Sequence, residues 1–380
     1  MKLAIISHTP HYKKNGVVVG WGPTVREINH LTNLFDEIYH IAPLHKEEAP
    51  ASSLPYESDG INFIPLKPYG GVKFSDKISI LTTSLNNLGI IKKILDKVDW
   101  VQFRAPTSMG LYVLPYLSLR NTPKRWVKYA GNWNMNNPPL SYKFQKWWLQ
   151  NNFQKSKVTI NGYWEDQRSH ILNFQNPCLD NEELERARKI AQEKKFDAKL
   201  VLCFAGSLTE NKGVDLILDS LNKVKQKSEI KEIIFAGDGI NRKKYEELAS
   251  KINMRIIFKG FINRKELESI YKDSHIIMLP SESEGFPKVI AEAAAYGCVP
   301  IVSDVSSISQ YFNDSNGFLL KKITSDELAE KIDLAMSDRL KLKILSDQCV
   351  KAAELFTFEH YMNRLEEKIL FSGQIHCRPK

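Results

Sequence analysis

The chain of 380 residues has 53 Lys+Arg against 44 Asp+Glu, a formal net charge of +9, with 43% hydrophobic and 26% charged residues. This length and composition suit two globular domains and exclude an intrinsically disordered chain. They also exclude a membrane-spanning protein, because no stretch approaches the roughly 18 apolar residues that a spanning helix needs.

The positive charge is unevenly placed. Residues 1–178 contain 21 Lys+Arg and 12 Asp+Glu, which accounts for the whole excess. No acidic residue lies between Asp99 and Glu165, where nine basic residues occur, and all seven tryptophans precede residue 165. The excess charge is therefore a property of residues 100–164.

The N-terminus and the cysteines indicate the compartment. The apolar run after Lys2 is too short for a signal peptide. The five cysteines are scattered and odd in number, without CxxC spacing, so we expect reduced thiols and no disulfide frame or zinc site. The nine histidines show no HExxH pairing. We expect a cytoplasmic protein.

In the first half, apolar runs alternate with helical patterns, as is typical of a parallel α/β sheet. A glycine-rich loop containing Gly16, Gly20 and Gly22 follows the first run, and Pro23 suits the first turn of a helix. The helix has an apolar face of Ile28, Leu31 and Leu34. The predicted strands are Lys2–Ser7, Glu37–Ala42, Trp100–Phe103 (which ends at Arg104-Ala105-Pro106) and Arg125–Ala130.

The charge-dense segment 178–199 is predicted to be helical and to link two domains, after which the pattern restarts. Helix Val214–Val224 follows the first strand of the second half. The predicted strands there are Leu200–Ala205, Glu232–Ala236, Arg255–Lys259, His275–Leu279 and Val299–Ser303. Glycine loops after these strands place ligand-binding loops at one edge of each sheet.

The most informative segment is Pro280–Ala293. Gly285 and Pro287 mark a turn that opens a helix, whose first N–H groups are unpaired and favour anions. Glu284 precedes this helix, Glu292 lies two turns into it, and both carboxylates can accept hydrogen bonds from hydroxyls. A sugar attached to a diphosphate needs such groups. The alternative interpretation is that both are solvated helix charges.

This segment resembles the Glu-x7-Glu signature of the retaining glycosyltransferases of family 4, which have the GT-B fold. The resemblance covers nearly all of residues 199–365. It implies two Rossmann-like domains that face each other across a cleft, with a C-terminal helix crossing back to the first domain. The implied domains are residues 1–178, joined by the helix at about 357–375, and residues 179–356, which bind the donor.

The resemblance assigns donor-binding roles to the second half. Glu284 would contact hydroxyls of the donor sugar and Glu292 the nucleoside ribose, with Gly285, Phe286 and Pro287 forming the donor-facing turn. In the loop Gly206–Gly213, Lys212 matches a lysine that binds the diphosphate, whereas Ser207 stands where the family usually has an arginine. Phe261 and Ile262 would line the base pocket, and Gly237 is expected mainly to permit a close turn.

The resemblance is weaker in the first half. Gly22 corresponds to one glycine of a pair that approaches the donor phosphate, although Trp21 interrupts that pair. Arg104 falls where many members have an active-site histidine. An arginine cannot act as a general base, because its pKa exceeds about 12, but it could bind phosphate or an anionic acceptor. A surface cation is the alternative for Arg104, and His8 is a further candidate.

The implied reaction moves a sugar, with retention, from a nucleotide diphosphate sugar to a hydroxyl of a glycan or lipid-linked acceptor, as in polysaccharide or lipopolysaccharide synthesis. Glu284 and Arg104 are the catalytic candidates. No metal or other cofactor is expected, because positive side chains and a helix N-terminus would stabilise the leaving diphosphate and no Asp-x-Asp triplet occurs. The alternatives are a GT-B sugar-nucleotide epimerase and a basic nucleic-acid-binding protein, which the neutral second half disfavours.

Residues 139–157 interleave aromatic and basic side chains without an acid. Such a pattern suits an anionic membrane surface, so residues 100–164 predict peripheral association with the inner face of the membrane. The alternative is a core-packing helix with solvated lysines.

Overall fold

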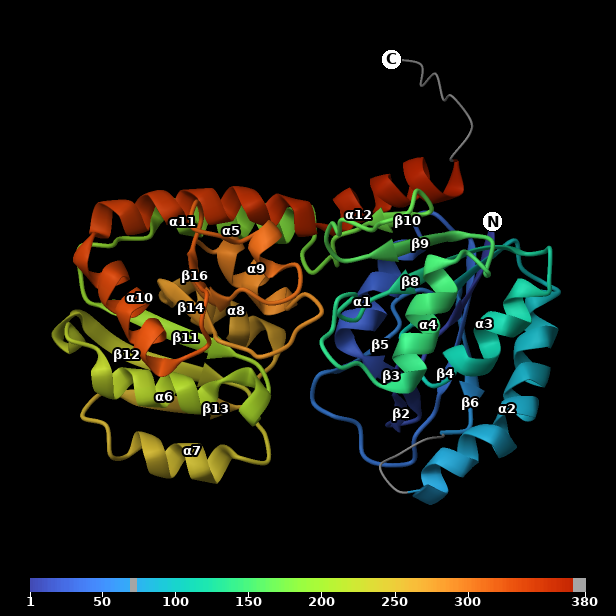
Figure 1. The fold of residues 1–380 in the computed structure, drawn as a ribbon, viewed down its shortest axis with the longest axis horizontal. Helices are drawn as coiled ribbons and strands as arrows, with labels where there is room; N and C mark the ends of the chain where they lie inside the picture. The colour runs from blue at the N-terminus through green and yellow to red at the C-terminus, as the bar shows by residue number, and fades with distance from the viewer. Residues whose placement is uncertain (69–73, 372–380) are drawn as a thin grey trace, which may run out of the picture. The chain divides into compact units, whose positions relative to one another are not determined.

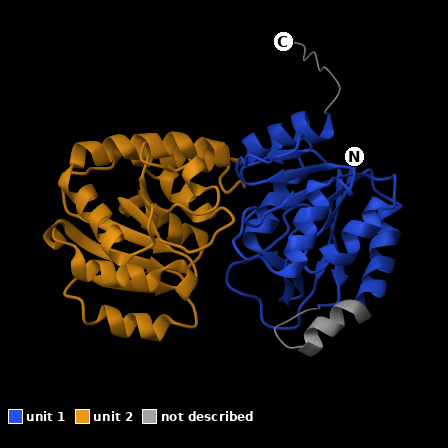
Figure 2. Ribbon diagram, viewed as in Figure 1, with its two compact units in different colours: residues 1–175, 358–380 blue, residues 176–357 orange. Residues whose placement is uncertain are grey.

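The computed structural model describes residues 1–68 and 74–371, and the chain divides into two units (Figures 1 and 2). Unit 1 contains residues 1–175 and the C-terminal segment from Phe358, and unit 2 contains residues 176–357. Cys377 lies outside the described residues.

Unit 1 is built on a seven-stranded sheet in the order β10-β9-β8-β7-β1-β4-β6, with every neighbouring pair parallel. The chain order reverses between β1 and β7, which places a topological switch point there. The strands are β1 (Lys2–Ile6), β4 (Glu37–Pro43), β6 (Ile61–Leu66), β7 (Trp100–Ala105), β8 (Lys124–Tyr129), β9 (Lys157–Ile160) and β10 (Ile171–Asn173).

Helices cover both faces of this sheet, as the buried positions of the strands require. One core lies between the sheet and helices α2 (Phe74–Leu95), α3 (Gly110–Ser118) and α4 (Leu140–Gln150). The other face packs against α1 (Gly22–Leu31) and α12 (Phe358–Leu365), whose Tyr361, Met362 and Leu365 are buried there. The C-terminal helix is therefore part of unit 1, as the fold class predicted.

The predicted glycine-rich loop is wrong. Residues His11–Lys14 (β2) and Val17–Trp21 (β3) form a hairpin, and β5 (Ser53–Pro55) completes a small antiparallel sheet. Asn15 and Gly16 both have positive φ, 52° and 81°, as the favoured two-residue hairpin turn requires. The Asn-Gly pair was the local signal for this turn.

A hydrogen-bonded chain with a defined direction lies beside this hairpin. The carbonyl of Thr9 can only accept, so His11 Nδ1 donates to it (2.9 Å) and His11 Nε2 accepts from the Tyr56 hydroxyl (2.7 Å). His40 Nδ1 must then donate to the Tyr56 oxygen (2.5 Å), and His40 Nε2 accepts from Ser7 (2.7 Å). Both imidazoles are neutral in this arrangement.

These hydrogen bonds to neutral histidines predict that the protein loses stability in mild acid. Burial lowers the pKa of His11 to about 4 and lowers that of His40 well below its usual range. Below about pH 6.5 the unfolded chain therefore binds more protons than the folded protein. The free energy of unfolding is highest above that pH and decreases towards pH 4, by about 1.4 kcal/mol per pH unit for each histidine. Urea unfolding between pH 7.5 and 4.5 measures the effect. Imidazole NMR signals of either residue that titrate above pH 6 would contradict it.

Unit 2 has a six-stranded parallel sheet in the order β13-β12-β11-β14-β15-β16. Its strands are β11 (Leu200–Ala205), β12 (Ile230–Ala236), β13 (Ile256–Gly260), β14 (Ile276–Leu279), β15 (Val299–Ser303) and β16 (Phe318–Leu320). All residues of β11, β14 and β15 are buried, which explains their continuous apolar sequences.

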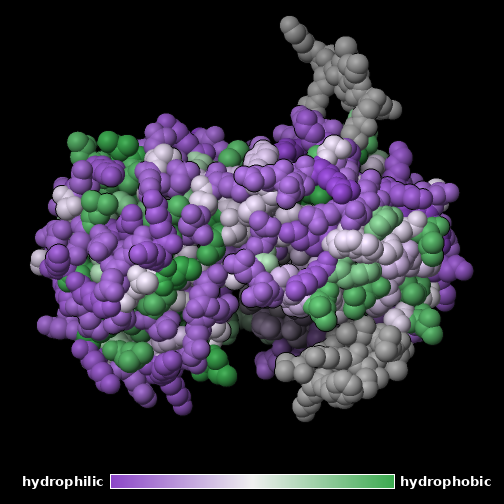
Figure 3. Space-filling view, viewed as in Figure 1, coloured by the Kyte–Doolittle hydropathy of each residue, from purple (hydrophilic) through white to green (hydrophobic). Residues whose placement is uncertain are grey.

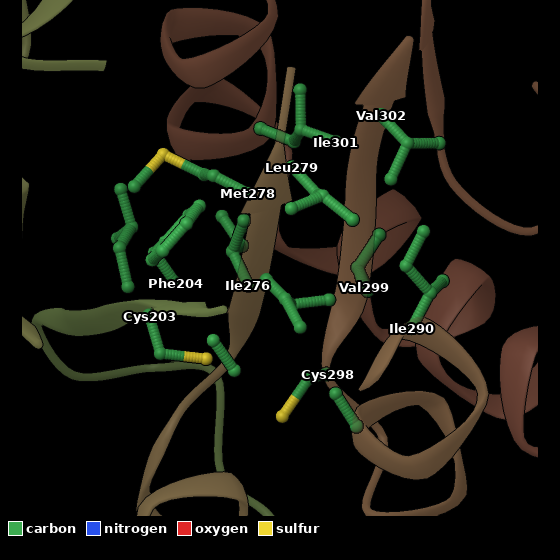
Figure 4. Packing of buried hydrophobic residues seen from close by; sticks show 14 of the residues in the cluster. Cys203, Phe204, Ile276, Met278, Leu279, Ile290, Cys298, Val299, Ile301 and Val302 are labelled. Atoms are coloured by element: carbon green, nitrogen blue, oxygen red, sulfur yellow. The ribbon is translucent and has the colours of Figure 1, made fainter. Parts of the chain in front are cut away.

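The helices of unit 2 enclose this sheet (Figure 1). They are α5 (Asn181–Glu193), α6 (Val214–Lys223), α7 (Arg242–Ala249), α8 (Arg264–Asp273), α9 (Lys288–Ala295), α10 (Ser325–Ser337) and α11 (Arg339–Ala353). Figure 4 shows Ile290 of α9 packed with residues of β14 and β15 in the central core. Cys178, Cys203, Cys298 and Cys349 are buried, and no disulfide joins cysteines among the described residues.

Candidate functional site

The carboxyl ends of β11 and β14 flank the point where the strand order of unit 2 reverses. Strands β12 and β13 continue from β11 in one direction, and β15 and β16 continue from β14 in the other. Loops after the two central strands diverge at such a point and leave room for a ligand. The loop Gly206–Gly213 follows β11, and the loop from Pro280 to Pro287 follows β14.

Lys212 and Glu284, one from each of these loops, form an ion pair. The Lys212 Nζ atom donates to Glu284 Oε1 at 2.5 Å. The Glu284 side chain is 8% exposed and that of Lys212 is 22% exposed. The sequence analysis predicted a donor-binding role for each residue separately, and the fold brings the two side chains together across the switch point.

Backbone contacts hold the two loops in this position. Gly213 has φ of 72°, and a Cβ atom there would lie 2.4 Å from the Pro280 carbonyl oxygen. The Glu282 N–H donates to the Asn211 carbonyl (3.0 Å). Lys212 is thus fixed by the tight packing of one loop on the other.

Gly237 permits a second close approach. Its φ is 137°, and a Cβ atom would lie 1.8 Å from the Gly206 carbonyl oxygen. The Gly206 N–H also donates to Ala236 O (3.0 Å). The space beside Gly237 is therefore filled by the backbone that precedes Ser207 and Lys212.

Gly237→Ala is expected to destabilise the protein by about 2–5 kcal/mol, since it combines backbone strain of about 1–2 kcal/mol with overpacking of about 1–3 kcal/mol. Gly16→Ala is the matched control: φ is 81° there, but nothing lies within 4 Å of the added Cβ, so we expect only about 1–2 kcal/mol. Urea unfolding of both variants measures the difference, and equal losses would contradict it.

An aromatic cluster packs against the turn before α9. The Phe286 side chain is buried and stacks on Phe356, with ring centroids 4.5 Å apart. The Gly285 carbonyl accepts from Ser306 Oγ (2.9 Å), and Pro287 is the N-cap of α9. Phe286 anchors the turn, while the backbone at Gly285 and the first N–H groups of α9 are the parts able to meet a ligand.

Glu292 lies on α9 and pairs with Arg264 of α8, whose Nη1 donates to Glu292 Oε1 at 3.1 Å. Arg264 also donates to Glu183 Oε1 (3.0 Å) and to the Cys178 carbonyl (3.1 Å). Burial disfavours the charge of Arg264, but the carboxylates of Glu292 and Glu183 raise its pKa above the usual range. Glu292 is therefore held by Arg264, whose guanidinium also pairs with Glu183 and Glu268.

The other expected donor-binding residues of unit 2 surround this edge. Phe261 is 71% exposed and Ile262 is half-buried, directly after β13. Ser207 is exposed, and its hydroxyl lies 3.4 Å from that of Thr209. Their roles in base and phosphate binding stay predictions.

Arg104 of unit 1 lies within β7, not after its end, and is buried. Its Nη2 donates to Glu27 Oε1 (2.6 Å) and its Nε to Gln102 Oε1 (2.8 Å), while Nη1 lies 3.4 Å from Thr24 Oγ1. Lys128, its register partner on β8, donates to the same Glu27 oxygen at 2.7 Å. The surface-cation interpretation is therefore wrong, and anion binding by Arg104 stays a prediction.

Gly22 and His8 lie at the carboxyl edge of the unit 1 sheet. Gly22 begins α1, and its N–H donates to the Ser52 carbonyl at 3.1 Å. A Cβ atom there would lie 2.6 Å from that same oxygen. The glycine is thus required for packing of α1 against β5. His8 follows β1 at the switch point.

Residues that complete these ion pairs were not predicted. Arg264 pairs with both Glu292 and Glu183, and Glu27 pairs with both Arg104 and Lys128. The sequence did contain a signal for the position of Arg264 at the start of a helix, because Asn263 and Glu266 form the capping box of α8. Glu27 had none, since an acid on an amphipathic helix usually faces solvent.

The basic, aromatic segment forms helix α4, whose fully buried side chains are Gln145 and Leu149. Trp147 is 51% exposed, and Phe153, 42% exposed, packs against it (5.1 Å between ring centroids). Figure 3 shows hydrophobic surface over α3 and α4. This region contains the exposed side chains of Leu111, Leu119, Leu140, Trp147 and Phe153. No helix within the described part of the chain has the length and apolar character needed to cross a bilayer.

Comparisons with known proteins identify similar chains. Residues 185–356 match the family model described as Glycosyl transferases group 1. The O-antigen biosynthesis glycosyltransferase WclY of Escherichia coli is 28% identical over 230 residues, which are 57% of this chain and 62% of that protein. The first curated relatives are matched over about half to three fifths of their own length.

Several solved structures match nearly the whole chain. Sucrose-phosphate synthase from Thermosynechococcus elongatus has a TM-score of 0.72 at 16% identity, covering 98% of this chain and 100% of its own. HepE from Anabaena, in complex with UDP, has a TM-score of 0.70 at 14% identity, covering 96% and 98%. At these identities the likeness shows the fold, and it confirms the predicted GT-B class.

Proposed function

We propose that this protein is a retaining glycosyltransferase of family 4, which moves a sugar from a nucleotide diphosphate sugar to an acceptor hydroxyl. The Lys212–Glu284 pair at the switch point of unit 2 carries the proposal. In this proposal Lys212 supplies a cation for the diphosphate and Glu284 a carboxylate for the sugar hydroxyls, with the N-terminus of α9 as a further anion-binding group.

In this proposal the donor replaces one ion pair by two better-matched contacts. The diphosphate takes the ammonium of Lys212, and Glu284, released from it, accepts hydrogen bonds from the sugar. The bond between the anomeric carbon and the diphosphate oxygen breaks, the acceptor oxygen bonds to that carbon, and the proton of the acceptor hydroxyl passes to the departing diphosphate. Negative charge develops on the departing diphosphate, where Lys212 and the helix N-terminus stabilise it without a bound metal.

Glu292 is proposed to bind the ribose. Arg264 aligns its carboxylate, because one oxygen of Glu292 accepts from the guanidinium while the rest of the carboxylate can accept from a diol. Exposed Phe261 and half-buried Ile262, after the neighbouring strand β13, would contact the base.

The acceptor is proposed to be a glycan or lipid-linked hydroxyl of a surface polysaccharide. The similarity to an O-antigen biosynthesis glycosyltransferase supports this class. The exposed aromatic and apolar side chains over α3 and α4, beside the lysines of α4, support peripheral association of unit 1 with an anionic membrane.

The donor site is tested with a thermal-shift panel of UDP, GDP, ADP and their sugar conjugates. At 100 times Kd a bound nucleotide stabilises the protein by about 2.7 kcal/mol, so we expect one base to raise the Tm clearly. Glu292→Ala should remove that shift and EDTA should leave it unchanged, whereas Glu330→Ala, an exposed position on α10 outside the proposed contacts, should retain it. Absence of stabilisation by every nucleotide would refute the donor site. Turnover of the donor without an acceptor would indicate the epimerase alternative.

Membrane association is tested by vesicle flotation. We expect binding to vesicles of phosphatidylglycerol and phosphatidylcholine, little binding to phosphatidylcholine alone, and a loss in the variant Trp147→Ser/Phe153→Ser. Equal binding to both vesicle types would contradict the anionic-surface role.

A further inference from the structure

A basic pocket of about 480 Å³ lies at the amino edge of the unit 1 sheet. Trp100, Lys124 and Lys157, which begin β7, β8 and β9, line it. Parallel strands start at one edge and end at the other, so this pocket is on the opposite edge from Arg104 and the loops of the switch point. It is therefore separate from the candidate site of unit 1.

The lining of the pocket is cationic and lacks acids. It includes Lys124, Arg125, Lys155, Lys157 and His170. Among the described residues none of these five forms an ion pair with a carboxylate. Four permanent cations that share one concave surface repel each other, and an anion bound between them would remove that repulsion.

Two acids on segments next to the pocket, Asp96 and Asp99, already have partners. Asp96 accepts from Arg120 Nη2 (2.5 Å), and Asp99 accepts from the Lys2 N–H (2.7 Å). Arg125 donates from Nη2 to the Arg120 carbonyl, while its buried Nη1 has no hydrogen-bond partner among the described residues. Burial and the charge of Arg120 both lower the pKa of Arg125. A buried donor of this kind strongly favours an acceptor with negative charge.

The remaining walls give the pocket a defined shape. The Lys124 ammonium lies 5.6 Å from the centre of the Trp100 ring, a cation–π distance that holds the lysine over the wall. Lys155 has φ of 53°, so the short connection from α4 to β9 turns its chain back at the pocket. A monovalent carboxylate would neutralise only one of the four cations, whereas a phosphate ester or diphosphate carries about two or more negative charges and several acceptor oxygens.

We propose that this pocket is a second anion site, which binds a phosphate ester or diphosphate group. The inference concerns unit 1 alone and does not depend on the transfer reaction. The phosphate could belong to a soluble molecule or to a lipid headgroup, since the recognising chemistry is the same for both.

Calorimetric titration with inorganic pyrophosphate tests the proposal. It uses the full chain with Lys212→Met, which removes the proposed diphosphate ligand of unit 2. We expect binding that weakens at least tenfold in Lys124→Gln/Lys157→Gln. Lys13→Gln/Lys14→Gln, which removes the same charge from the exposed hairpin strand β2, should leave it unchanged.

Flotation of the same three proteins on vesicles containing phosphatidic acid, whose headgroup is a phosphate monoester, identifies the source. Loss of pyrophosphate binding in the pocket variant indicates a site open to soluble phosphates. Loss of vesicle binding alone, with no pyrophosphate binding by any protein, indicates a lipid headgroup. Equal losses in the pocket and control variants, or binding only of single-stranded RNA, would overturn the proposal. Unchanged urea unfolding of Lys124→Gln/Lys157→Gln shows that the variant is folded.

Discussion

Lys212→Met is expected to lower kcat for sugar transfer by about 10²–10³-fold, the loss that follows removal of one group that stabilises transition-state charge. The departing diphosphate gains charge as the bond to the anomeric carbon breaks, so the loss should fall on kcat more than on KM. Steady-state kinetics with the nucleotide sugar identified by the thermal-shift panel measures both.

Two further variants separate chemistry from folding. Lys212→Arg keeps a positive charge at the same place and should recover part of the rate. Lys231→Met removes an exposed lysine from β12, the strand beside β11, and should change kcat less than threefold. Because Lys212→Met also leaves Glu284 buried without its cation, its unfolding must be measured. A rate within threefold of the native protein would refute the role of Lys212.

Glu27→Gln is expected to destabilise the protein by about 3–5 kcal/mol, because it leaves the buried cations Arg104 and Lys128 without their counter-charge. The side chains of Glu27, Arg104 and Lys128 are 3%, 9% and 5% exposed. Urea unfolding of the full chain measures this loss.

The control for that prediction is Glu37→Gln. Glu37 pairs with Lys2 at 2.8 Å, but their side chains are 28% and 50% exposed, so water screens the pair and we expect a far smaller loss of stability than in Glu27→Gln. The triple variant Glu27→Gln/Arg104→Met/Lys128→Met should recover stability relative to Glu27→Gln, since no unpaired buried charge remains. A loss below 1 kcal/mol for Glu27→Gln would show that water or another anion reaches these cations.

The predicted strands agree closely with the observed ones where every residue is buried and none is charged. Leu200–Ala205 and Val299–Ser303 have the same bounds in the prediction and the structure. Strand β7 extends to Ala105, past the predicted end at Phe103, because Arg104 is polar and seemed to close the strand. The hairpin at Asn15-Gly16 was missed because glycines suggested a loop.

The sequence by itself determined the two α/β units, the glycine loops after the strands and the Glu284 and Glu292 segment, because apolar runs and turn residues act over a few neighbouring positions. Only the tertiary structure decided which charged residues form ion pairs. Lys212 and Glu284 are 72 residues apart in the sequence, Arg264 and Glu292 are 28 apart, and Arg104 and Glu27 are 77 apart. The tertiary structure also gathers part of the net charge of +9 in one basic pocket, because β8 and β9 are neighbours in the sheet and their first residues lie side by side. Ion-pair partners depend on which strands and helices become neighbours, and the free energy that selects those neighbours comes from burial of the whole core, so no local pattern records the pairing.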